Sequence, residues 1–436
     1  MSKTAASTHS LTKEQKKTIA LLSIGTFLEY FDLMLYVHMA VLLNELFFPS
    51  SDPFTTSLLS AFAFCSTYIL RPFGAIVLGY IGDNYGRKVT IIISTTIMAF
   101  SCLVMANVGT YAQIGIAASW IVTMCRVCQG LSSLGEIISA EIYLVENLSR
   151  PVMYPMVCMV VVASAFGGFA ALGIASLTTA QNFNWRWAFW FGALVALIGV
   201  IARTTLRESR DFVDAKKQLK NTFKKNNICT SNLSTNPVWA QKIDLRVVIS
   251  YFFMECTSPV YFYINYIYCA DILKSLGLDS HEIIKHNFLL SGINVFNAML
   301  LTFLVSRIHP IRILQYKFIF FVPFILFMPF MFEYITQENE LYILQILSIF
   351  LCCTAFPANS VIFTHFPILQ RFTYSTFAFA IAKAITYCVT AFGVSYLYQI
   401  FNHVGLLILL VPINIGYFFA MQFFKKREIV KGNYLM

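Results

Sequence analysis

Charged side chains are scarce in this sequence of 436 residues, where Asp, Glu, Lys and Arg together make up only 12%. A soluble globular protein carries about 25% charged residues, because water must solvate most of its surface. Hydrophobic residues make up 58% of the chain and include 42 Phe. The shortage of charge excludes an ordinary soluble domain and indicates an integral membrane protein.

A cleavable leader and a set of metal ligands are missing as well. The first 20 residues are polar and basic, without the short apolar core and small-residue cleavage site of a signal peptide. Of the eleven cysteines, all except Cys229 fall in apolar segments, and the CxxC pair Cys125 and Cys128 has no second ligand pair to complete a zinc site. We therefore expect no removable signal peptide, no metal and no cofactor.

Twelve apolar runs are long enough to cross a bilayer, which takes about 20 mostly apolar residues. They lie near 19–43, 54–81, 89–108, 112–144, 153–180, 186–205, 245–273, 283–305, 312–332, 340–362, 371–398 and 404–424. Six runs precede a polar, lysine-rich segment and six follow it, which predicts an all-α membrane protein of two six-helix domains. The expected division is an N-terminal tail (1–18), a first domain (19–205), a linker (206–243), a second domain (244–424) and a C-terminal tail (425–436).

Lys and Arg gather on one side of the predicted spans, in the tails, the linker and alternate loops. This census places Arg307, Arg312 and Lys317 together in the connection between the eighth and ninth spans. Basic residues mark the cytoplasmic side, so we predict a protein of the cell (inner) membrane with both termini and the linker in the cytoplasm. The formal net charge of +10 then reflects topology, and we expect no nucleic-acid partner.

The first and fourth spans carry polar stripes. Glu29 and Asp32 are three residues apart and share one face of the first span; Arg126, Gln129 and Glu136 follow a helical spacing in the fourth. A charge at the centre of a bilayer costs about 2.5–3.5 kcal/mol on insertion scales. Such stripes must therefore face one another or a watery cavity.

Three further charges, Arg71, Glu255 and Lys383, lie inside the second, seventh and eleventh spans. Counting about 1.5 Å per residue puts Glu29 and Arg71 at a similar depth and makes them a candidate ion pair. Static pairs that hold the bundle together are one interpretation. A central cavity for a small solute and a proton is the other, and we favour it because so many buried charges are costly.

Two motifs resemble a known family. The loop GYIGDNYGRK (79–88) resembles the cytoplasmic loop signature of the major facilitator superfamily, with Asn84 in place of a basic residue, and RVCQG (126–130) resembles its motif associated with proton coupling. LEYFDLMLY, LRPFGAIVLGYIGDNYGRK and LRESRDF resemble, in order across 25–212, the metabolite:proton symporter branch that includes bacterial proline and betaine transporters. In the second half, LVSRIHPIRI (304–313) lacks the Asp and Gly of the corresponding loop.

The resemblance implies two six-helix domains around a midplane site. A membrane enzyme would need a nucleophile–base pair or a metal site, and the seven His lie mostly near span ends or outside the spans, so we expect no enzymatic activity. The resemblance also implies that Asp32 and Arg126 couple the proton to the solute. The residues it assigns to a cytoplasmic gate are Gly79, Asp83, Gly86, Arg87 and Glu146.

We accordingly expect a monomer in the lipid bilayer that performs proton-coupled symport of a small zwitterionic or anionic metabolite by alternating access. The alternatives are a solute sensor that does not transport, and a uniporter or exchanger whose ion pairs are structural.

Overall fold

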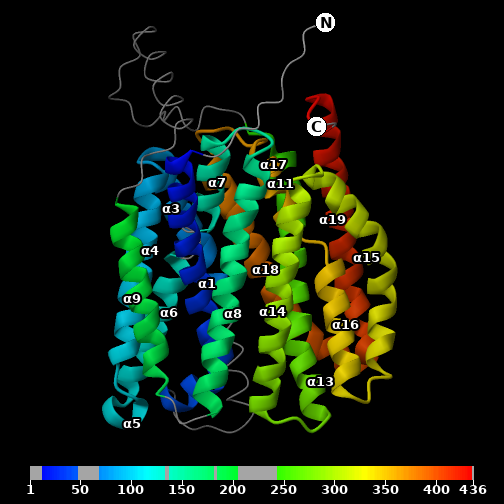
Figure 1. Ribbon diagram of the computed structural model, residues 1–436. Helices are drawn as coiled ribbons and strands as arrows, with labels where there is room; N and C mark the ends of the chain where they lie inside the picture. The colour runs from blue at the N-terminus through cyan, green and yellow to red at the C-terminus, as the bar shows by residue number, and fades with distance from the viewer. Residues whose placement is uncertain (1–11, 48–67, 133–136, 181–183, 205–242, 435–436) are drawn as a thin grey trace, which may run out of the picture.

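The computed structural model of the protein describes residues 12–47, 68–132, 137–180, 184–204 and 243–434. Throughout these ranges the regular elements are helices, which run up and down one common axis (Figure 1). The first described helix begins, and the last one finishes, at the same end of the bundle. We call this the termini end, and the other the opposite end.

In the described ranges of the first half of the chain there are eight helical elements. They are α1 (Lys13–Phe47), α3 (Arg71–Asn84), α4 (Arg87–Asn107), α5 (Tyr111–Ile114), α6 (Ile116–Ser132), α7 (Ile137–Asn147), α8 (Met153–Ala180) and α9 (Arg186–Arg203). Pro72 lies in the first turn of α3, where its missing N–H costs nothing. Gly86 separates α3 from α4 at φ 120°, a backbone conformation that side chains disfavour and glycine permits.

The second half begins with a broken rod. It contains α11 (Leu245–Glu255), α12 (Thr257–Phe262), the π-helical η3 (Tyr263–Tyr268) and α13 (Cys269–Ser275). Next come α14 (Ser280–Val305), α15 (Pro310–Phe332), α16 (Glu338–Leu351), η4 (Phe356–Ala358) and α17 (Asn359–Phe363). The last elements are α18 (Arg371–Phe401), η5 (Asn402–Gly405) and α19 (Leu406–Val430). Asp279 and Glu282 form a reciprocal cap that starts α14.

Where the chain is described, these elements match the predicted spans; of the second span, only its last part, with α3, lies in the described residues. The fourth corresponds to α6 and α7, the seventh to α11 through α13, and the tenth to α16 through α17. Within the described residues, nine helical stretches are long and apolar enough to cross a membrane, and the last of them contains both α18 and α19. The chain is a multi-pass membrane protein, and large apolar side chains such as Phe73, Trp120 and Phe327 point outward, as lipid contact requires.

Among the described residues, the two halves meet mainly along two helix pairs. Helix α3 packs against α18, and α8 packs against α14; Figure 1 shows the second pair side by side at the middle of the molecule. This architecture confirms the predicted fold of two six-helix domains. The residue limits of the two domains stay a prediction, because most of the linker (206–243) lies outside the described residues.

Candidate functional site

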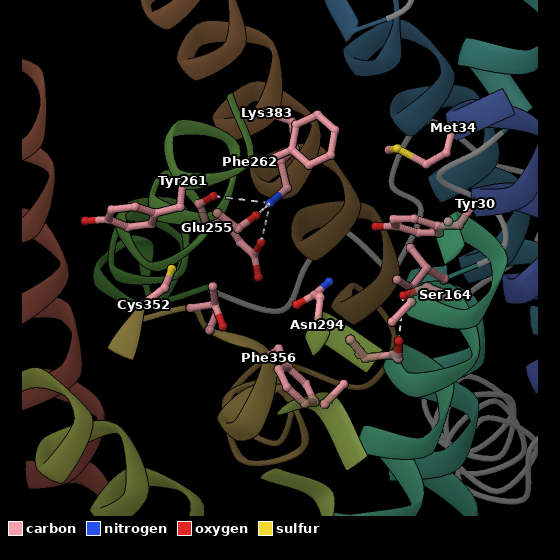
Figure 2. Close-up of a pocket in the computed structure, with 18 of the residues that line it drawn as sticks. Tyr30, Met34, Ser164, Glu255, Tyr261, Phe262, Asn294, Cys352, Phe356 and Lys383 are labelled. Carbon is pink, nitrogen blue, oxygen red and sulfur yellow. Dashed lines mark hydrogen bonds and ion pairs between the residues drawn. The ribbon is translucent and has the colours of Figure 1, made fainter. Parts of the chain in front are cut away.

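A cavity of about 290 Å³ lies between the two halves of the chain. Side chains from α1, α3, α7 and α8 line it on one side, and side chains from the second half line it on the other. Figure 2 shows Tyr30, Met34 and Ser164 across the cavity from Glu255 and Lys383. A site shared by two halves can respond to movement of one half against the other.

A buried ion pair forms one wall of this cavity. Lys383 Nζ lies 3.1 Å from Glu255 Oε2, with side chains only 9% and 6% exposed. The same ammonium donates to the hydroxyl of Ser258 and, at 3.3 Å, to the backbone carbonyl of Glu255. That carbonyl is available because its helical partner four residues on would be Pro259, which has no N–H. The proline thus breaks the helix and leaves an acceptor for Lys383.

Arg71 forms part of the opposite wall. Its side chain is 4% exposed, and its guanidinium lies 4.5 Å from the centre of the Tyr68 ring. Within the described part of the chain, Nε and Nη2 of Arg71 have no hydrogen-bond partner. Buried polar groups are nearly always hydrogen-bonded, and a guanidinium can hold a carboxylate through two parallel bonds. Arg71 therefore offers a binding position for an anion.

The other predicted cavity residues of the first half lie behind its wall. Glu29, Asp32, Arg126 and Gln129 are buried but do not line the cavity. Asp32 Oδ1 accepts a hydrogen bond from Cys102 Sγ at 3.1 Å and interacts electrostatically with Arg126, whose Nη1 donates to Gln129 Oε1 at 2.9 Å.

The predicted cavity residues thus form two groups. Arg71, Glu255 and Lys383 line the cavity, whereas the buried residues on α1 and α6 do not. Glu136 lies outside the described residues, and the pairing of Glu29 with Arg71 stays a prediction.

Two wall residues that sequence reasoning did not single out are Glu141 and Asn359. Asn359 Nδ2 lies 3.2 Å from each carboxylate oxygen of Glu141, and this contact joins α7 to α17 across the two halves. Glu141 lies five residues beyond Glu136, off the spacing of three and four that identified the polar stripe. Its presence as an acid inside a predicted span was the available signal.

The assignment of Lys317 to a loop was wrong. The census of basic residues counted it in a loop, but α15 already begins at Pro310, and Lys317 lies seven residues further, about 10 Å along the helix. Its side chain is half-buried and lines the cavity. The remaining polar and aromatic lining includes Tyr30, Tyr68, Tyr261, Phe262, Asn265, Tyr266, Asn294, Asn297, Phe356 and Tyr387.

The residues predicted to form a gate lie at the termini end. Asp83 Oδ2 accepts hydrogen bonds from the backbone N–H (2.8 Å) and the hydroxyl of Thr373, in the first turn of α18. A carboxylate at a helix N-terminus is favoured by the exposed N–H groups there. Arg371 Nη1 donates to Glu146 Oε1 at 3.3 Å. Asp83 and Glu146 belong to the first half of the chain, and both thus bind the first turn of α18 in the second half.

Glycine allows this close contact. A Cβ at Gly79 would lie 2.9 Å from the Cα of Thr373, and one at Gly82 would lie 2.1 Å from the ring of Phe372. Gly86 supplies the turn that follows Asp83, and Arg87 is the first residue of α4. The structure describes the backbone of Arg87 but not its side chain.

A second cross-link at the termini end surrounds Glu428, which is fully buried near the end of α19. Arg150 Nη1 donates to Glu428 Oε2 at 2.7 Å, and His365 Nε2 lies 2.9 Å from Oε1. His309 Nε2 is 3.7 Å from the same carboxylate. Burial holds the pKa of His365 below its usual range. Because Arg150 lies between α7 and α8, this cluster also bridges the two halves.

Comparisons with known proteins agree with this architecture. A sequence profile of the Major Facilitator Superfamily matches residues 22–347. The inner membrane metabolite transport protein YhjE of Escherichia coli (strain K12) is 30% identical over 286 residues, which cover 62% of this chain and 62% of that protein. A putative proline/betaine transporter of Staphylococcus aureus (strain COL) is 33% identical over 208 residues, covering 46% and 45%. The matches to these curated relatives thus span 45% to 62% of the relatives' lengths.

Solved structures extend the likeness in fold to nearly the whole chain. The proton:xylose symporter XylE bound to 6-bromo-6-deoxy-D-glucose has a TM-score of 0.74 at 15% identity, covering 94% of this chain and 95% of that one. The human organic anion transporter MFSD10 (TETRAN) has a TM-score of 0.65 at 15% identity, covering 94% and 100%. At such identities the likeness concerns the fold alone.

Proposed function

Because the chain belongs to the Major Facilitator Superfamily, we propose that it is a secondary active transporter that moves a small carboxylate-bearing metabolite together with a proton. The observation that carries this proposal is the buried guanidinium of Arg71, which lines a cavity shared by both halves and has two nitrogens without a partner in the described residues. The names of the relatives, a metabolite transport protein and a proline/betaine transporter, support a small solute.

Alternating access follows from where the halves are held together. The contacts of Asp83, Glu146 and Glu428 all close the termini end, so the conformation fits a state in which solute enters from the opposite end. Release then requires these contacts to break while the halves rock about the site. If both termini are cytoplasmic, as the distribution of basic residues predicts, this conformation faces outward.

Asp32 is the proposed proton carrier. It is 2% exposed and lies on α1, the helix that also supplies Tyr30 and Met34 to the cavity wall. Burial penalises an ionised carboxylate unless a partner or a proton compensates it. A proton on Asp32 weakens its attraction to Arg126, and a change at α1 reaches the solute through the wall residues on the same helix. Proton and solute then favour the same conformational change, which is the condition for coupling.

Uptake into proteoliposomes tests the function. Labelled proline, betaine and a panel of small organic acids are offered with and without an inward proton gradient. We expect one class of carboxylate to accumulate only with the gradient. Uptake that ignores the gradient indicates a uniporter or exchanger with structural ion pairs, and no uptake of any solute in the panel contradicts transport of a small carboxylate and favours the sensor.

A further inference from the structure

The tenth span is broken where it passes the cavity. Helix α16 ends at Leu351, and the chain resumes helical structure only at Phe356, in η4. Cys352 and Phe356 both border the cavity (Figure 2). In transporters, discontinuous helices frequently form substrate sites, because their unpaired backbone groups face a watery cavity instead of lipid.

Lys317, which belongs to the neighbouring helix α15, lines the cavity beside this break. Helix α15 packs against α16 and η4, and Lys317 lines the cavity together with Cys352 and Thr354. Its side chain is half-buried, and within the described residues its ammonium has no hydrogen bond or ion pair. A cation taken part of the way out of water and left without an anion is costly, so its position needs an explanation.

The charges that line the cavity do not balance within the protein. The ionisable Lys, Arg and Glu side chains on the wall are Arg71, Lys317, Lys383, Glu141 and Glu255. Lys383 is paired with Glu255, and Glu141 is bonded to the amide of Asn359. A neutral amide does not cancel the charge of a carboxylate, so the wall carries three basic groups against two acidic ones. Arg71 and Lys317, which belong to opposite halves of the chain, are the two basic groups without an ion pair in the described residues.

We propose that the solute is a small dicarboxylate, with one acid group bound by Arg71 and the other by Lys317 at the break of the tenth span. This inference rests on the proposed transport function and narrows its substrate class. A molecule that ties one half to the other binds best when the halves close around it, so the second acid group favours the movement that carries the solute across. The cavity volume of about 290 Å³ restricts the solute to a small one.

Binding measurements on the purified full-length protein test this inference. The probes are succinate and glutarate, each compared with its monoamide, which keeps one carboxylate and nearly the same shape. At pH 7.5 we expect each diacid to bind about tenfold to a hundredfold more tightly than its monoamide, because the second acid forms a charge-assisted contact. Lys317→Met should abolish this preference by weakening the diacid more than the monoamide, whereas Lys317→Arg should keep it.

The outcomes separate this inference from the proposed function. Equal binding of diacid and monoamide, or tighter binding of proline or betaine than of either diacid, overturns the dicarboxylate and leaves carboxylate transport standing. A preference for the diacid that persists in Lys317→Met, or in Lys317→Gln if the Met variant does not fold, overturns the role of Lys317. If neither diacids, monoamides, proline nor betaine bind, the proposed function itself fails.

Discussion

At the scale of single residues, the buried charges of the cavity differ in whether neighbouring groups of the protein bind them. Lys383 is held by the Glu255 carboxylate and by the carbonyl that Pro259 leaves unbonded. Arg71 has no comparable set of acceptors among the described residues. One site is therefore satisfied by the protein itself, and the other is available to an anion.

Removing one member of the satisfied pair should destabilise the protein. Lys383→Met leaves the Glu255 carboxylate buried without its cation, and loss of one partner of a buried pair costs about 3–5 kcal/mol. We expect a clear fall in the thermal unfolding midpoint in detergent. The double variant Lys383→Met, Glu255→Gln should recover part of the loss, and a double variant no more stable than the single one would contradict a direct pair.

Removing the available cation should affect the solute more than the fold. Arg71→Met deletes the carboxylate site, and we expect solute affinity to fall about tenfold or more while the unfolding midpoint changes little. Arg71→Lys keeps the charge but loses the two-pronged geometry, so its affinity should lie in between. Wild-type affinity in Arg71→Met would exclude Arg71 from solute binding.

At the scale of the elements, α3 and α18 approach closely because glycine lies at their contact. The Cβ of an alanine at position 79 would lie 2.9 Å from a backbone atom of Thr373, so the helices must separate. Position 393 of α18 is a matched control, because a Cβ there has ordinary contacts of 3.6 Å with Leu409.

Gly79→Ala should therefore loosen the termini end. We expect faster amide hydrogen exchange in the first turns of α18, where Asp83 bonds to Thr373, because the closed state is less populated. Gly393→Ala should leave exchange in that segment unchanged. Equal exchange in both variants would show that the α3–α18 contact does not control closure.

The elements also show what the sequence could reveal. Apolar runs identified the spans, because length and hydropathy alone decide whether a helix can cross a bilayer. Charges inside those runs identified Arg71, Glu255 and Lys383 as wall residues. The predicted span at 312–332 already contained Lys317, and α15 begins close to that limit, at Pro310. The role of Lys317 was missed because the basic-residue census counted it with the connection before the span.

Contacts between distant segments could not be predicted from spacing. Glu141 meets Asn359 across 218 residues, and Arg150 meets Glu428 across 278. Such pairs depend on how the two halves dock, which no periodicity within one helix encodes. The segment 304–313 contains no Asp or Glu. In the structure its His309 lies beside Glu428, an acid supplied by α19.

At the scale of the whole molecule, the Glu428 cluster connects closure of the termini end to pH. His365 faces Glu428 through Nε2 and Lys431 through Nδ1, and Arg150 and His309 contact the same carboxylate. Arg427, which pairs with Asp244, also acts electrostatically on His365. Lys431 donates to Nδ1, so the proton of a neutral His365 is on Nε2, toward Glu428. A second proton on His365 would face the Lys431 ammonium.

Acidification should therefore weaken closure. Burial lowers the pKa of His365 in the closed state, so below about pH 6.5, the usual pKa of histidine, the released state binds more protons and gains relative stability. We expect faster hydrogen exchange in residues 364–370 at pH 5.5 than at pH 7.5, after correction for intrinsic rates. His365→Gln should lack this additional increase, and a variant that keeps it would place the pH sensitivity elsewhere.

Proton movement during solute entry tests the central claim most directly. Solute is added to proteoliposomes without a pre-formed gradient, and the external pH is followed with wild type, Arg71→Met and Asp32→Asn. We expect wild type to alkalinise the medium as solute enters, Arg71→Met to do so weakly, and Asp32→Asn to exchange labelled solute without proton movement. Solute entry by wild type with no pH change would contradict proton symport, and an undiminished proton signal in Asp32→Asn would exclude Asp32 as the carrier.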